Sequence, residues 1–338
     1  MYTFMTIVKQ RTKLQFVLEA LISSTLLALA LWGIDFSGLW KALRNANYLW
    51  LFPSAMSVIL LLLLKAWRWQ LLYYPEYRLS FGSVFTALSA GFFISNILPA
   101  RLGEVLRVLL IVSEQPVGIA RTTSTIIIEH LLDVATLMVF LIFLLPFISL
   151  PPMLANVSKT LGILVIAGIV VMIFISLWRD RLVLWMDNAP SCLSFLKKPA
   201  IYNFIIHLVD GFTVMRTHTG VLIIGISLFG WLLVVVTAWS AAEALNLDVS
   251  TLAIMFAVVV TTLGMIVPSS PGYIGVFHYL VIISLNPFGV TKDIALALAL
   301  LWHAVNYLTL SASGYIALWI HGTSLGQILR RYRDGTIV

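Results

Sequence analysis

The sequence predicts an all-α integral membrane protein with six full transmembrane helices and two re-entrant helical hairpins, arranged as an inverted repeat. Three observations predict this fold class. Hydrophobic residues make up 61% of the 338 residues and charged residues only 10%, whereas soluble domains contain about 25% charged residues. No Asp, Glu, Lys or Arg occurs from Val249 to Thr291 or from Ile294 to Leu329, and apolar runs longer than about 18 residues are typical of membrane spans. Finally, Pro and Gly interrupt two of the apolar segments.

This composition excludes a soluble enzyme, a disordered tail and a disulfide scaffold. The net charge of +7 comes from basic residues in short loops rather than on one arm, so no nucleic-acid partner is expected. Cys192 is the single cysteine, which excludes an intramolecular disulfide and a thiolate metal cluster. No metal site and no cofactor is predicted.

Each full crossing needs about 20 apolar residues. Such crossings are predicted at 14–34, 48–66, 123–147, 160–178, 220–242 and 293–320.

Two further apolar segments, 83–112 and 251–286, are predicted to be hairpins whose tips lie inside the membrane. The apolar segment that follows Pro99 is too short for a second crossing. The turn that follows Pro268 is too short for an exposed loop, and the residues on either side of it are apolar. Irregular backbone at membrane depth is tolerated where it is buried in protein or lines a cavity.

The chain is expected to form one transmembrane domain over residues 1–338. Its parts are a first half-repeat at 14–147, a cytoplasmic loop at 179–219 and a second half-repeat at 220–320. Basic residues favour the cytoplasmic side of membrane proteins. With both termini cytoplasmic, fifteen Lys and Arg residues lie on that side and four lie outside. The charge distribution therefore predicts the orientation, although it does not distinguish a hairpin from two full crossings.

The two halves share short motifs. Pro-x-x-x-Gly occurs at Pro99–Gly103 and at Pro268–Gly272, and His-x-x-(Asp or Asn)-x-x-Thr-Leu begins at His130 and at His303. The predicted topology gives these halves opposite orientation. Paired, Pro/Gly-interrupted segments in inverted halves indicate a transporter with its binding site near the midplane.

Several charged residues fall inside apolar segments. Arg101, Glu104 and Arg107 follow at spacings of three, which places them on one helix face, and Glu129 and Asp133 are one helical turn apart. A charge at the bilayer centre costs about 2.5–3.5 kcal/mol, so these residues must pair or face a wet cavity. One interpretation is a structural salt-bridge network. The other is a substrate site in which both arginines hold a phosphate and the acids balance it or bind a cationic group.

Residues that shape the two hairpin tips are predicted to be Pro99, Gly103, Pro268, Pro271, Gly272 and Gly275. Secondary candidates are His130, His303 and Asn306, although a lone histidine such as His303 is more often a packing residue. Lys65 and Arg68, beside Trp67 and Trp69, are interpreted as an anchor at the membrane surface.

Four segments together resemble the lysylphosphatidylglycerol synthase transmembrane (flippase-like) family. They are Trp67–Trp69, Asn96–Arg107, Glu129–Asp133 and Pro268–Gly275. The resemblance covers roughly residues 10 to 320. It implies movement of phospholipid between leaflets of a prokaryotic plasma membrane. The sequence departs from the family pattern in two ways: no soluble aminoacyltransferase domain is expected after the last span, and His130 stands where the family is expected to favour Arg.

The leading functional hypothesis is a translocator that moves an anionic or aminoacylated phospholipid, or a lipid-linked precursor, by alternating access. The expected partners are membrane phospholipids and a separate lipid-modifying synthase. One alternative is a membrane enzyme or accessory subunit of envelope lipid or glycolipid synthesis, although no nucleophile elbow, P-loop or HExxH motif is present. The other alternative is an ion-coupled transporter of a small anion.

Overall fold

The computed structural model describes residues 13–98, 102–148, 160, 162–163, 166–168, 170–171, 174, 177–188, 198–266, 269–320 and 322. Within these ranges the regular structure is helical throughout, with no strand. The α-helices are α2 (Lys13–Leu31), α3 (Phe36–Arg44), α4 (Leu51–Leu71), α5 (Phe81–Ile97), α6 (Leu102–Glu114), α7 (Ile119–Leu144), α9 (Arg179–Asp187), α10 (Pro199–Thr213), α11 (His218–Ala244), α12 (Thr251–Gly264), α13 (Val276–Leu285) and α14 (Lys292–Ile320). Short 3-10 helices are η1 (Tyr48–Trp50), η2 (Leu145–Phe147), η4 (Val214–Arg216), η5 (Pro271–Tyr273) and η6 (Asn286–Phe288).

Four described helices are long and apolar enough to cross a membrane. They are Tyr48–Leu71, Ile119–Phe147, His218–Ala244 and Lys292–Ile320. A fifth candidate is the pair α2–α3, which is bent by 87°. The all-α, multi-pass membrane fold predicted from the sequence is therefore confirmed, while the predicted crossing at 160–178 lies largely outside the described residues.

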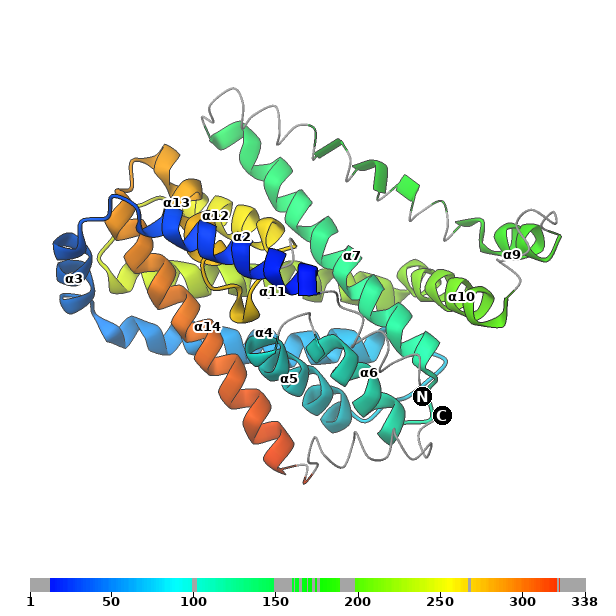
Figure 1. The fold of residues 1–338 in the computed structure, drawn as a ribbon. Helices are drawn as coiled ribbons and strands as arrows, with labels where there is room; N and C mark the ends of the chain where they lie inside the picture. Colours follow the sequence, from blue (N-terminus) through cyan, green and yellow to red (C-terminus); the bar gives the residue numbers. More distant parts are fainter. Residues whose placement is uncertain are drawn as a thin grey trace.

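The two segments predicted as hairpins are each a pair of short helices that pack on each other. α5 packs against α6 and α12 packs against α13, and Figure 1 shows the two pairs in separate parts of the bundle. The predicted tip residues Pro99 and Pro268 lie outside the described residues. Gly272 and Gly275 have φ values of 65° and 91°, which is the left-handed region that glycine enters without steric cost.

The C-terminal end of α5 and the break between α12 and α13 lie against α14 and close to each other. The Asn96 side chain, one turn before the first break, donates hydrogen bonds to Tyr307 O at 3.3 Å and Ser311 Oγ at 2.9 Å. In the second break, a Cβ on Gly272 would meet the Tyr307 ring and, at 3.5 Å, the carbonyl oxygen of Asn96. α14 therefore contacts both the end of α5 and the second break.

The segment 179–219, predicted as a loop, is mostly helical in its described part. α10 packs along α7, so closely that a Cβ on Gly211 would collide with Ile128. α9 lies at the far end of the molecule from α3 (Figure 1). Residues 201–209, inside the predicted loop, form the middle of α10.

Glycines allow the helices around α5 to approach closely. A Cβ on Gly103 would collide with the carbonyl oxygen of Gly91 and with Ser95 Oγ, and a Cβ on Gly314 would collide with the Ser89 carbonyl. Lipid provides no hydrophobic drive for helix association, so membrane helices associate through close contacts between small residues. Gly103, predicted to shape a hairpin tip, lies in the first turn of α6 and allows α6 to pack against α5.

We expect Gly103→Ala to lower the free energy of unfolding by about 1–3 kcal/mol, because the added methyl group overpacks a contact between two backbones. Thermal unfolding in detergent, followed by loss of the monodisperse species, measures this effect. Gly225→Ala is the matched control, because Gly225 is an exposed helical glycine with no atom within 4 Å of the new Cβ. Equal melting temperatures for the two variants would contradict the assigned α5–α6 contact.

Candidate functional site

An ion pair between α6 and α7 lies in the interior of the bundle. Arg107 Nη2 is 2.5 Å from Glu129 Oε2, and both residues are buried. The Arg107 guanidinium also lies 4.1 Å from the centre of the Trp69 ring, at a distance suited to a cation–π interaction. The structure therefore brings together two of the residues that the sequence predicts for the site.

Asp133, one turn after Glu129, pairs with α4. Its carboxylate accepts hydrogen bonds from Lys65 Nζ at 2.8 Å and Arg68 Nη1 at 2.7 Å. The same two cations approach Glu129 Oε1, with Arg68 Nη2 at 3.6 Å and Lys65 Nζ at 4.0 Å. We call these five side chains the ion cluster: Lys65, Arg68, Arg107, Glu129 and Asp133.

The interpretation of Lys65 and Arg68 as a membrane-surface anchor is wrong. Arg68 is only 2% exposed, and α4 continues to Leu71, beyond the predicted end of the crossing at residue 66. The spacing of Lys65 and Arg68 in the sequence already indicates that they pair with the carboxylates of α7. Lys65 and Arg68 lie three residues apart on one helix face, which matches the one-turn spacing of Glu129 and Asp133 on the facing helix.

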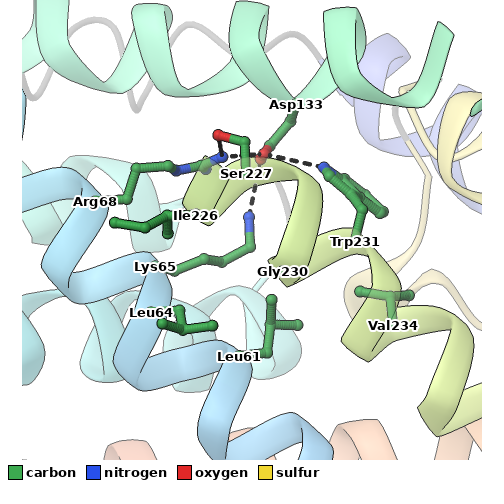
Figure 2. A pocket seen from close by; sticks show the side chains of 10 residues that line it. All are labelled: Leu61, Leu64, Lys65, Arg68, Asp133, Ile226, Ser227, Gly230, Trp231 and Val234. Atoms are coloured by element: carbon green, nitrogen blue, oxygen red, sulfur yellow. Dashed lines mark hydrogen bonds and ion pairs between the residues drawn. The ribbon is translucent and has the colours of Figure 1, made fainter. Parts of the chain in front are cut away.

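The ion cluster borders a small pocket between α4, α7 and α11. Figure 2 shows Asp133 pointing from α7 towards Lys65 and Arg68 on α4, with Trp231 of α11 beside it. Trp231 Nε1 donates to Asp133 at 3.3 Å, and Arg68 Nη1 donates to Ser227 Oγ at 2.9 Å. The space between these side chains holds little more than a water molecule.

The ion cluster carries one more positive than negative charge. It contains three cations and two carboxylates, in a bundle whose remaining walls are mostly apolar. Among the described residues, Arg68 Nε and Nη2 and Arg107 Nε are buried and have no hydrogen-bond acceptor. Buried polar groups are nearly always hydrogen-bonded. The arrangement can therefore accept an anion with hydrogen-bond acceptor oxygens.

The other predicted site residues of the first half lie at the edge of this arrangement. His130 Nε2 is 3.1 Å from Glu104 Oε1, and their side chains are 44% and 33% exposed. Glu104 and His130 thus bridge α6 and α7 on a more accessible face than Arg107 and Glu129 do. Arg101 lies outside the described residues.

The secondary candidates of the second half lie beside the α12–α13 break. The His303 ring centre is 5.0 Å from that of His278 and 4.9 Å from that of Phe277. Asn306 Nδ2 donates to the Trp302 carbonyl of its own helix at 3.0 Å. Described His, Cys, Asp and Glu side chains do not form a group of three or more that could hold a metal ion.

We expect Glu129→Gln to destabilise the protein by about 3–5 kcal/mol, because removal of one member of a buried ion pair leaves charge uncompensated. Thermal unfolding in detergent measures the loss. Asp180→Asn is the control: Asp180 pairs with Arg179 across 3.0 Å, but its side chain is 87% exposed, and exposed pairs contribute little. An unchanged melting temperature for Glu129→Gln would contradict the assigned ion pairs.

Comparison with known proteins identifies relatives of the chain. Residues 16–314 match the family described as the lysylphosphatidylglycerol synthase TM region. Two membrane proteins of Methanocaldococcus jannaschii are similar. The UPF0104 membrane protein MJ1595 is 25% identical over 89% of this chain and 93% of its own length, and the UPF0104 membrane protein MJ1078 is 23% identical over 68% of this chain and 94% of its own. No solved structure matches the sequence.

The family match covers both helix pairs, the ion cluster, three of the four long helices and most of α14. The chain therefore belongs to the lysylphosphatidylglycerol synthase transmembrane-region family.

Proposed function

We propose that this protein moves a phospholipid with an anionic headgroup, or a lipid-linked precursor, between the leaflets of a membrane by alternating access. Aminoacylated phospholipids belong to the same class, because they retain the phosphate. The family match supports a lipid-related membrane function. The observation that carries the proposal is the excess positive charge of the ion cluster in the interior of an apolar bundle.

The phosphate binds to the cations of the ion cluster. Arg107 and Arg68 have buried N–H groups without acceptors, and guanidinium groups bind phosphate oxygens in a two-pronged geometry. An anion there neutralises a charge that costs about 2.5–3.5 kcal/mol near the bilayer centre. Arg101, which directly precedes α6 in the sequence, is proposed to join them.

The carboxylates hold the cations in position while the site is empty. Glu129 and Asp133 keep the guanidinium groups paired, and Glu104 lies at the more exposed edge. When the headgroup carries an ammonium group, these acids bind it. The pocket beside the ion cluster is too small for a headgroup, so the described conformation is occluded and α4, α7 and α11 must separate for loading.

The topology that suits this mechanism has six crossings and two re-entrant hairpins, α5–α6 and α12–α13, in inverted halves. Each helix of the two pairs is shorter than the about 20 residues that a crossing needs. The end of α5 and the second break meet at α14 through Asn96, Tyr307 and Gly272, which supports an arrangement of broken helices around a central site. Both termini are proposed to be cytoplasmic, in a prokaryotic plasma membrane.

Translocation in liposomes tests the proposal. Purified protein is reconstituted with a trace of fluorescent phosphatidylglycerol, and the label that becomes inaccessible to an impermeant quencher is followed over time. We expect Arg107→Ala to abolish movement. Arg107→Lys is expected to slow it by about tenfold or more, because one charge-assisted hydrogen bond contributes about 1.5–3 kcal/mol.

Arg179→Ala is the matched control, because Arg179 pairs with Asp180 and Asp210 on α9 and α10. Each variant is compared only after its reconstituted amount and melting temperature have been measured. Wild-type rates from both Arg101→Ala and Arg107→Ala would overturn the site.

Other outcomes of the same assay would favour the alternative functions. Flux of a small anion without lipid movement would favour the small-anion transporter, and product formation would favour a membrane enzyme. Activity only with a co-purified lipid-modifying synthase would favour an accessory role.

A further inference from the structure

The nine-residue helix α3 (Phe36–Arg44) presents three chemically different faces. Leu39 and Leu43, one turn apart, pack on the hydrophobic core of the bundle. Phe36 and Trp40, also one turn apart, are 63% and 67% exposed. The third face carries Lys41 and Arg44. A helix with a packed face, an exposed aromatic face and a basic face is suited to a boundary between three media: protein, hydrocarbon and headgroups.

The direction of α3 places it along the membrane surface. α3 makes an angle of 87° with α2, and Figure 1 shows it at one end of the molecule, transverse to α4. Since α4 crosses the membrane, a transverse helix at its end lies parallel to the membrane plane. The charge distribution predicts that this is the outer face.

Exposed aromatic and apolar side chains continue on both sides of α3. Trp32 is 78% exposed, Tyr48 53%, Leu49 81% and Phe52 71%. Trp and Tyr are enriched where the hydrocarbon meets the headgroups. These residues therefore mark the same membrane boundary as Phe36 and Trp40.

The two cations of α3 have no acidic partner in the part of the chain that the structure describes. They are three residues apart on one helix face and both are exposed. The nearby Asp35 instead caps the helix, where its Oδ1 accepts the Ser37 amide at 3.0 Å. Two neighbouring exposed cations beside lipid-facing aromatic rings are complementary to phosphate groups of the surrounding leaflet.

We propose that α3 is a surface-lying lipid-binding helix, which inserts Phe36 and Trp40 at the hydrocarbon boundary and binds phosphate groups of anionic phospholipids through Lys41 and Arg44. This lipid stays bound to α3 at the outer membrane face. It is distinct from the lipid proposed to reach the ion cluster. The inference holds whether or not the protein translocates lipid, because it rests on the surface of α3 alone.

Depth measurements test the first half of the proposal. A Cys192→Ser background removes the single cysteine, so nitroxide labels can be placed singly at Phe36, Trp40, Lys41 or Arg44 in nanodiscs of phosphatidylcholine and phosphatidylglycerol at 3:1. We expect labels at 36 and 40 to be more accessible to oxygen than to a water-soluble nickel complex, and labels at 41 and 44 to show the reverse. Equal nickel accessibility at all four positions would overturn the proposal. Dipolar broadening between copies at 36 and 40 would overturn it too, since this face would then contact a second chain.

Lipid retention tests the second half. Native mass spectrometry of protein extracted from the same mixed membranes compares bound phosphatidylglycerol with bound phosphatidylcholine. We expect Lys41→Ser and Arg44→Ser each to lower the preference for phosphatidylglycerol by about fivefold, as expected for one cation at an anionic surface. Arg179→Ser, an ion-paired cation on α9, is the control. An unchanged preference in the Lys41→Ser/Arg44→Ser double variant would overturn phosphate binding by α3.

Discussion

The cost of charge in a low-dielectric interior determines how α4, α6 and α7 are arranged. Arg107 on α6, Glu129 and Asp133 on α7, and Arg68 on α4 are each stable at membrane depth only when the others are within ion-pair distance. Their contacts therefore fix which faces of three helices point inward. The surrounding apolar side chains then pack around a polar centre that cannot move without separating charges.

The ion cluster also requires α6 to lie close to α5, and small residues make this close packing possible. Arg107 is held against α5 because Gly91 leaves room for its side-chain carbons, and Gly103 lets α6 approach the Gly91 carbonyl. On the other side of α5, Gly314 lets α14 approach Ser89. α14 in turn contacts the second helix break through Tyr307. The ion cluster and the second break are thus linked through close contacts at Gly91, Gly314 and Gly272.

The sequence predicted those features that depend on local composition. Uncharged apolar runs predicted the membrane helices, and charges inside such runs singled out Arg107, Glu129 and Asp133. The partners on α4 were missed because a Lys and an Arg at the end of an apolar run look the same whether they reach outward to phosphates or inward to carboxylates. Only the contact between α4 and α7 distinguishes these cases. α3 was missed because nine residues of mixed polarity carry no span-length signal.

The separation of the ion pairs along the chain has a consequence for biogenesis. Asp133 follows Arg68 by 65 residues, so α4 is synthesised with its two cations well before the carboxylates that neutralise them. Alone in lipid, α4 would expose unpaired charge until α7 supplies the carboxylates. The charges of α4 are therefore neutralised only once α7 lies in the bilayer beside it. α11, which adds Ser227 and Trp231 to the finished pairs, closes around them afterwards.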